Sequence, residues 1–235
     1  MNAMRKYLIL TMFIAFTTSA FAQFSLSYEL KETADFYRMN QLLNKSGNTD
    51  INLKDVKGSP YLNNEFVSGT IYTTMKTQYN DVPLRYNLYN DDLEFKNPAG
   101  EILALAKPEI VEYAVFGNDR LVYCNYSVGN KPKQGFLVLK QEGNAALLSK
   151  VSVIYQEPTE PGAYKEAEPA KFVRRAEEHY IRIGSEMALP VSNRKSVLEA
   201  FPDNRDKIEN FISKNKIKLN KPEGLAEVVK FYNSL

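Results

Sequence analysis

A two-residue alternation of apolar and polar side chains is the feature that most limits what this chain can fold into. It begins near Glu65 and continues to about Tyr155. The run over 83–91 shows it well, with Leu84, Tyr86 and Leu88 on one side and Arg85, Asn87 and Tyr89 on the other. Successive side chains of a β-strand point to opposite faces, so this period predicts strands with one face on a core.

The same period recurs in short runs separated by loops of turn length. After the runs over 65–74 and 83–91, strands are predicted over 92–96, 101–106, 110–116, 120–126, 135–140 and 145–155, and a last hairpin over 178–183 and 186–191. The loops carry Asn, Asp, Gly and Pro, which favour turns. Parallel strands need long crossovers, for which these loops leave no room. The pattern therefore predicts an antiparallel meander, either open or curved into a half-barrel.

The period changes to that of a helix over the last 44 residues. Ser192 is placed to cap a first helix, Pro202 and Asp203 to separate it from a second, and 220–222 to open a third. Their apolar faces consist of Val197, Leu198 and Phe201, then Ile208, Phe211 and Ile212, then Leu225, Val228, Val229 and Tyr232. Such faces need a partner surface. The predicted class is therefore α+β, with an antiparallel sheet at 65–191 and a helical cap at 192–235 in the same domain.

The first 22 residues have the three parts of a secretory signal peptide. Arg5 and Lys6 precede an apolar run that is too short to span a bilayer, and the segment closes on Ala20-Phe21-Ala22. We expect cleavage after Ala22 and export to the periplasm or the outside of the cell. No later run predicts a transmembrane segment. The stretch over 23–64 is predicted as an N-terminal segment of mostly loop character, in which the apolar spacing over 34–44 fits a short helix.

Composition excludes several classes of function. The chain has 30 Lys and Arg against 28 Asp and Glu, and both surplus cations belong to residues 1–22. Nucleic-acid binding, which needs a basic surface, is therefore not expected. The single Cys and single His exclude disulfide frameworks, CxxC sites and sites that need two imidazoles. Phosphate-binding loops and the GxSxG and HExxH motifs are also missing from the sequence.

Three stretches resemble an uncharacterised family of exported proteins from Bacteroidota. They are GSPYLNNEFVSGTIYT at 58–73, VPLRYNLYNDDLEFK at 82–96 and KIENFISKNKIKLNKPEGLAEVVKFYNSL at 207–235. The resemblance implies a bacterial signal peptide and a place in the cell envelope. It carries no catalytic residues to this chain.

The residues that most often carry chemistry have ordinary structural interpretations here. Cys124 lies on a predicted strand, which is typical of a buried thiol. His179 lies among mixed charges. The oxygen-rich group Asn90, Asp91, Asp92 and Glu94 has calcium-like ligands but not the spacing of an EF-hand, and Asn-Asp pairs also form plain turns. The lysines between Lys214 and Lys221 fit the end of a helix. We therefore predict no catalytic residue, no metal site and no cofactor.

The best candidates for a binding surface are Arg85, Asn87 and Tyr89, which share the strand face turned away from Leu84 and Tyr86. Tyr is abundant in the strand region, where it serves either recognition or packing. The leading hypothesis is an exported, non-enzymatic envelope protein that binds a ligand or a protein partner through its sheet.

Two alternatives remain open at this point. One is a hydrolase that works with carboxylates alone, as glycosidases do, using a pair among Asp91, Asp92, Glu94, Glu101 and Glu112. The other is a structural assembly protein, which would present an exposed apolar patch or an unpaired sheet edge. The ligand, the partner and the oligomeric state cannot be deduced from these patterns.

Overall fold

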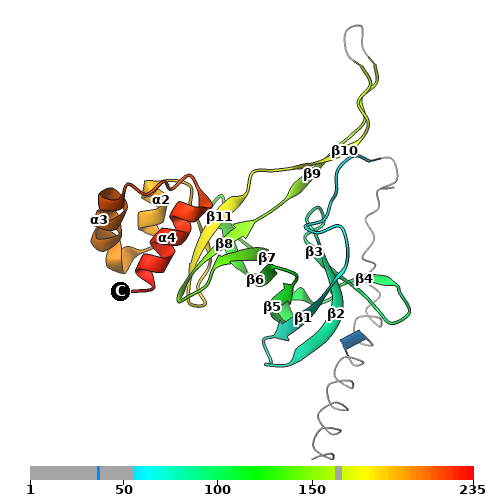
Figure 1. The fold of residues 1–235 in the computed structure, drawn as a ribbon, viewed down its shortest axis with the longest axis horizontal. Coiled ribbons are helices and arrows are strands. Elements are labelled where there is room, and N and C mark those ends of the chain that lie inside the picture. Colours follow the sequence, from blue (N-terminus) through cyan, green and yellow to red (C-terminus); the bar gives the residue numbers. More distant parts are fainter. Residues whose placement is uncertain (1–35, 38–55, 162–165) are drawn as a thin grey trace, which may run out of the picture.

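The computed structural model describes residues 36–37, 56–161 and 166–235. Within them, ten strands form one antiparallel sheet in the order β12-β11-β8-β7-β6-β5-β1-β2-β3-β4, with a helical cap at its β11 end (Figure 1). The strands are β1 (Val67–Thr73), β2 (Gln78–Asn87), β3 (Asp92–Lys96), β4 (Ile102–Ala104), β5 (Val111–Phe116), β6 (Asp119–Val128), β7 (Lys131–Gln141), β8 (Ala145–Lys150), β11 (Glu178–Ile183) and β12 (Leu189–Pro190). The predicted α+β class, with a curled antiparallel sheet and a C-terminal helical cap, is confirmed.

The sheet is not a simple meander. The first four strands follow one another, and then the short helix η2 (Pro108–Ile110) leads the chain back so that β5 pairs with β1. The backbone bond from Thr74 N to Ile110 O, at 2.9 Å, joins the two segments where they meet. From β5 to β8 the strands are again consecutive. Local periodicity predicts strands but not this return, which depends on contacts between distant segments.

The sheet curls so that the segment before β12 returns to β6. Ala188, just before β12, bonds back to β6: its N–H donates to Asn125 O at 2.9 Å, and its carbonyl accepts from Ser127 N at 3.0 Å. Side chains from one face of these strands fill the inside of the curl, namely Val122, Tyr126, Leu137, Leu148, Tyr180 and Ala188. The opposite face of the sheet carries a larger core, which includes Phe95, Phe116 and Phe136.

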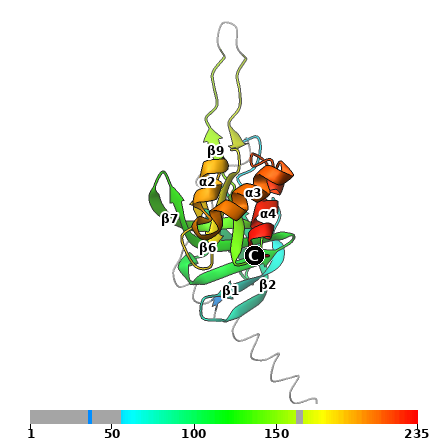
Figure 2. The same cartoon turned by 90° about the vertical axis from the view of Figure 1, so that its left-hand side faces the viewer.

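The run over 145–155, predicted as one strand, is two strands. β8 ends at Lys150, and β9 (Val153–Gln156) pairs instead with β10 (Lys171–Arg174). The two form a narrow arm that projects away from the sheet in both views (Figures 1 and 2). The described residues between these strands are mostly exposed. The hairpin predicted over 178–191 is present as β11 and β12.

The cap consists of α2 (Arg194–Glu199), η3 (Pro202–Asn204), α3 (Arg205–Asn215) and α4 (Pro222–Tyr232). Asn193, not the predicted Ser192, caps α2: its side chain accepts from Ser196 N at 3.0 Å. The predicted apolar faces are buried against β8 and β11, except for the half-buried Phe211 and Tyr232. Figure 1 shows the three α-helices to one side of the sheet, next to β8 and β11.

The predictions for the N-terminal part fall mostly on residues that the structure does not describe. The signal peptide at 1–22 lies outside them, and of the helix predicted over 34–44 only Phe36 and Tyr37 are described, both helical. Phe36 is buried against Tyr79 and Phe95. Across the described residues, no helix has the length and apolar character needed to cross a membrane.

Candidate functional site

Two of the three predicted binding residues, Arg85 and Asn87, surround one buried carboxylate. Arg85 Nε and Nη2 lie 3.2 and 2.7 Å from Glu94 Oε2. Asn87 Nδ2 donates to Glu94 Oε1 at 2.9 Å. The side chain of Glu94 is 0% exposed and that of Arg85 is 12% exposed. Burial raises the pKa of Glu94, and the bonds from Asn87 and Arg85 oppose that shift.

This strand face is covered by the segment that precedes β1. The rings of Tyr61 and Phe66 lie 3.6 and 4.2 Å from the Arg85 guanidinium carbon. Tyr89 lies apart from this group, with its ring edge-on to Phe172 at 5.5 Å. The three predicted residues therefore do not form one open surface, because Asn87 is fully buried and Arg85 is enclosed by aromatic rings. Any binding role for them is a prediction that the structure leaves untested.

Four of the five carboxylates considered for a hydrolase, those of Asp91, Glu94, Glu101 and Glu112, accept a hydrogen bond from a neighbouring side chain. Asp91 Oδ1 accepts from Lys150 Nζ at 2.7 Å and from the Tyr86 hydroxyl at 2.5 Å. Glu101 accepts from Asn97 Nδ2 at 2.7 Å, while Glu112 is paired with Lys76. No group of three or more metal-ligating His, Cys, Asp or Glu side chains occurs among the described residues.

His179 lies on β11 beneath the helical cap. Its Nδ1 is 2.8 Å from Ser149 Oγ on the neighbouring strand β8. Burial lowers the pKa of His179, so the neutral imidazole is favoured. The lysines from Lys214 to Lys221 lie at the end of α3 and in the loop that follows, as their spacing predicts.

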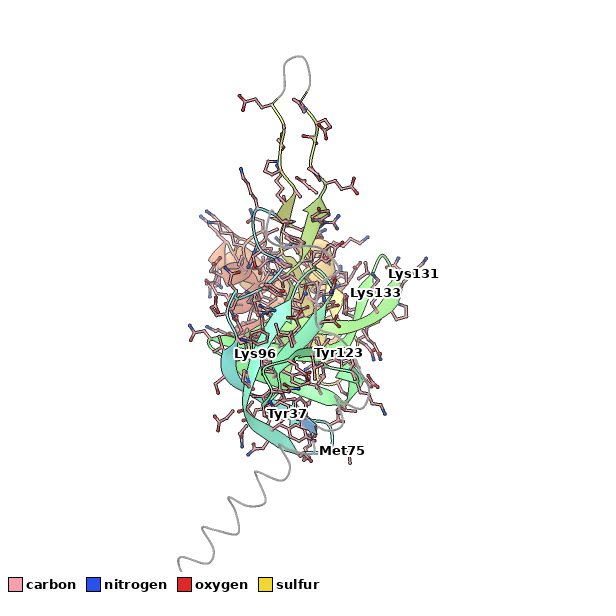
Figure 3. All side chains as sticks on the ribbon, turned by 90° about the vertical axis from the view of Figure 1, so that its right-hand side faces the viewer. Tyr37, Met75, Lys96, Tyr123, Lys131 and Lys133 are labelled. Carbon is pink, nitrogen blue, oxygen red and sulfur yellow. The ribbon has the colours of Figure 1, made fainter. Side chains whose placement is uncertain are left out.

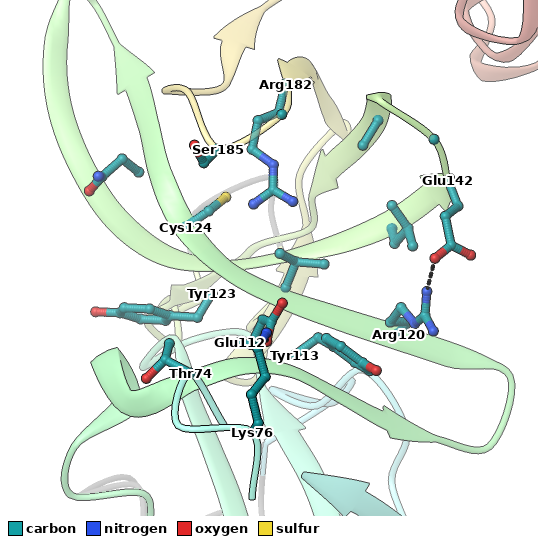
Figure 4. Close-up of a pocket in the computed structure, with 16 residues that line it drawn as sticks. Thr74, Lys76, Glu112, Tyr113, Arg120, Tyr123, Cys124, Glu142, Arg182 and Ser185 are labelled. Carbon is teal, nitrogen blue, oxygen red and sulfur yellow. Dashed lines mark hydrogen bonds and ion pairs between the residues drawn. The ribbon is translucent and has the colours of Figure 1, made fainter. Parts of the chain in front are cut away.

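A concave surface on another part of the sheet has the properties of a ligand site. We call it the central hollow; its volume is about 610 Å³. It is lined by Thr74, Lys76, Glu112, Tyr113, Arg120, Val122, Tyr123, Cys124, Asn125, Leu139, Glu142, Gly143, Ala146, Arg182, Gly184 and Ser185. These residues come from β5, β6, β7, β8 and β11 and from three turns, so only the curl of the sheet brings them together (Figure 4).

The floor of the central hollow is apolar because one strand face continues into it from inside the curl. Val122 and Cys124, two residues apart, share one face of β6, and Leu139 and Ala146 come from β7 and β8. The cross-strand pairs Val122–Leu137 and Leu139–Leu148 set this register.

The rim carries three cations and two carboxylates. Lys76 Nζ lies 2.8 Å from Glu112 Oε2, and Arg120 Nη1 lies 2.7 Å from Glu142 Oε1. Arg120 also lies 4.6 Å above the ring of Tyr113. Arg182 forms no ion pair with any described residue, and its Nε is buried without a hydrogen-bond partner. One positive charge of the rim is therefore left uncompensated.

Arg182 and Cys124 point toward one another across the upper part of the central hollow (Figure 4). Burial raises the pKa of the Cys124 thiol, and the charge of Arg182, a side-chain hydrogen bond with Arg182 and the charge of Lys150 offset only part of that effect. Cys124 is therefore held as a neutral thiol, which is a poor nucleophile. It is the only cysteine of the chain.

Lys150, the last residue of β8, is not among the residues that line the central hollow. Its Nζ donates to Phe136 O at 3.0 Å and to the Tyr86 hydroxyl at 3.2 Å, and it lies 5.6 Å from the Tyr126 ring. Burial, reinforced by the nearby Asp91 charge, raises the pKa of Tyr126 to about 12. Unlike Arg182, Lys150 is fully compensated, and it belongs to the packing of the sheet. Figure 3 labels Tyr37 and Tyr123, two partly buried residues that pack against the larger core.

Sequence patterns missed Arg182, which appears in them only as one of several charges near His179. The available signal was a single arginine on a strand whose neighbours Tyr180 and Ile181 are apolar. Comparisons with protein-family profiles, with curated proteins and with solved structures give no match to this chain.

Proposed function

We propose that this protein is an exported, non-enzymatic module that binds a small ligand in the central hollow of its sheet. The single observation that carries the proposal is Arg182, an uncompensated guanidinium at a concave surface of about 610 Å³ whose floor is apolar. A buried polar group without a partner costs free energy, which a ligand that supplies the partner recovers.

The rim carboxylates support binding rather than hydrolysis. A glycosidase-type pair needs one carboxyl held in its protonated form, usually by burial. The side chains of Glu112 and Glu142 are 44% and 74% exposed, and each is bonded to a cation. Neither carboxylate therefore has the buried, unpaired position of such an acid.

Export is the second part of the proposal. It is supported by the arrangement of residues 1–22. A receptor-like module in the envelope would hold its ligand without reacting with it.

The test is to express the full chain with its leader in a Gram-negative host, recover it from each cell fraction and examine it by native mass spectrometry. We expect recovery from the periplasm or medium, with a mass that fits cleavage after Ala22 and an adduct of a few hundred daltons that denaturation releases. Ser185→Trp places a large ring at the mouth of the hollow and should abolish the adduct. Ser68→Trp, on the exposed side of β1, should retain it.

Recovery only from the cytoplasm with the leader intact would contradict export. An adduct that persists in Ser185→Trp would place the ligand elsewhere. If no adduct is found, soaking the purified protein with extracts of the periplasm provides the second arm, and failure there as well would overturn the binding proposal.

A further inference from the structure

We infer that the ligand of the central hollow is an amphipathic monoanion, with a carboxylate held by Arg182 and an apolar body lying on the floor. This inference rests on the proposed function and adds the chemical class of the ligand. It makes Arg182 the residue that sets the specificity of the site.

The position of Arg182 favours an oxygen-acid head group. Its guanidinium extends from β11 into the hollow toward Cys124, and its Nε is buried without a partner (Figure 4). A guanidinium presents parallel N–H donors whose geometry matches the two oxygens of a carboxylate. The neighbouring Cys124 is a neutral thiol and cannot act as the counter-ion. A bidentate carboxylate would supply both the missing negative charge and the missing acceptor.

The charge balance of the rim favours one negative charge over two. Lys76 and Arg120 are already paired with Glu112 and Glu142, so only the charge of Arg182 is left. A dianionic phosphate monoester would bring a second charge close to two carboxylates with no free cation to receive it. A monoanion balances the hollow, whereas a dianion leaves it with a net negative charge.

The apolar side chains of the floor indicate the chemistry of the rest of the ligand. Within the lining, Val122, Leu139 and Ala146 form the part whose side chains offer no hydrogen bond. An alkyl or aryl body would cover them and remove apolar surface from water. A volume of about 610 Å³ lies within the range of pockets for small ligands and is too small for a folded partner.

The position of Cys124 allows a direct measurement of occupancy. As the only thiol of the chain, and one that lines the hollow, it reports any molecule that covers the floor. The experiment uses the purified protein, freed of bound ligand by denaturation and refolding, at pH 8.5. It measures the alkylation rate of Cys124 by iodoacetamide, together with binding by calorimetry. The probes are octanoate, its neutral analogue octanamide, and octyl phosphate, which is a dianion at this pH.

We expect octanoate to slow alkylation and to bind at least ten-fold more tightly than either octanamide or octyl phosphate. Arg182→Gln should lower the affinity for octanoate by about ten-fold or more and leave the affinity for octanamide unchanged. Arg182→Lys keeps the positive charge but not the paired N–H donors of the guanidinium. Its affinity for octanoate should lie between those of the unaltered protein and of Arg182→Gln. The matched control is Arg175→Gln, which removes a positive charge from an exposed position outside the hollow. It should change the affinity for each probe by less than about two-fold.

Each contrary result has a distinct meaning. If octanamide protects Cys124 as well as octanoate does, the hollow binds a ligand but the anion assignment is wrong. If octyl phosphate binds most tightly, the monoanion assignment is wrong. If no probe binds although an adduct co-purifies, the amphipathic class is wrong and the proposed function stands. If Arg182→Gln does not fold, the comparison of the three probes on the unaltered protein and Arg182→Lys decides.

Discussion

Asn233, which follows the last residue of α4, holds the backbone of Ala145 by two hydrogen bonds of opposite direction. Its Oδ1 accepts from Ala145 N at 2.8 Å, and its Nδ2 donates to Ala145 O at 2.9 Å. The β7–β8 pairing has already ended at Gln141 and Leu147, so Ala145 lacks a strand neighbour on that side. The side-chain amide takes the place of the missing neighbour and joins the helical cap to the sheet.

We expect Asn233→Ala to lower the free energy of unfolding by about 1–2 kcal/mol, because it leaves both Ala145 groups without their partner at a position that water reaches only in part. The measurement is urea denaturation followed by circular dichroism. Ser234→Ala, which removes an exposed hydroxyl one residue later, is the matched control and should cost less than about 0.5 kcal/mol. Equal stability of the two variants would show that the Asn233 bonds do not hold the cap.

The buried Arg85–Glu94 pair gives a larger effect. Arg85→Ala leaves the fully buried Glu94 with Asn87 as its remaining side-chain donor, so we expect a loss of about 3–5 kcal/mol. The lost cation–π contacts with Tyr61 and Phe66 add to it. Chemical denaturation measures the loss directly.

The companion variant separates the charge from the packing. Arg85→Met with Glu94→Leu replaces both ions by apolar chains of similar size, and we expect it to be more stable than Arg85→Ala by at least 1 kcal/mol. A double variant less stable than the single one would mean that the network contributes net stability through its hydrogen bonds.

The same pair shows what sequence patterns can and cannot reveal. Alternation identified the β2 and β3 strands and the buried residues Leu84 and Tyr86, because a half-buried strand follows that period. It also implied that Arg85 and Asn87 lie on a face turned away from the core. The register of the hairpin instead places Arg85 opposite Glu94, and the 59–66 segment covers both. Coverage by a distant segment leaves no trace in local periodicity.

The candidate site was beyond prediction for a related reason. Lys76, Glu112 and Arg182 are far apart in the sequence, and they share a surface only because β5 returns beside β1 and the sheet curls. The helical cap was predictable because each of its helices has an apolar face and a break before the next helix. Its cap residues were less so, since only α2 has a side-chain N-cap bond. The arm was only partly predictable, because the change of partner from β8 to β9 occurs inside one apolar run.

A substitution at Gly135 tests the hydrogen-bonded group of Asp91, Lys150 and Tyr86. A Cβ at this position would lie 2.7 Å from Asp91 Oδ2, and Asp91 itself has the left-handed backbone angle φ of +61°. Gly135→Ala should therefore displace Asp91 from Lys150 and cost about 1–3 kcal/mol. In an Asp91→Gly background the same substitution meets no carboxylate, so its cost should fall below 1 kcal/mol. A double-mutant cycle from urea denaturation measures the difference, and equal costs in both backgrounds would refute the contact.

The stability of the cap–sheet junction should depend on the protonation of His179. Burial holds its pKa below the unfolded value of 6.5; the charge of Lys140 acts in the same direction, and those of Glu177 and Glu223 oppose it. The unfolded chain therefore binds the proton more tightly. The contribution of the neutral imidazole to the free energy of unfolding is complete above pH 6.5. It is lost as the pH falls through 6.5 toward the pKa of His179 in the folded protein.

His179→Gln keeps a polar side chain opposite Ser149 but cannot titrate. Between pH 8 and pH 5 the free energy of unfolding of the unaltered protein should fall more than that of the variant, and the difference between the two curves isolates His179 from the carboxylates common to both. Denaturation at several pH values provides the measurement. Parallel curves, or an unaltered protein that gains stability on acidification relative to His179→Gln, would mean that the imidazole is not held neutral against β8.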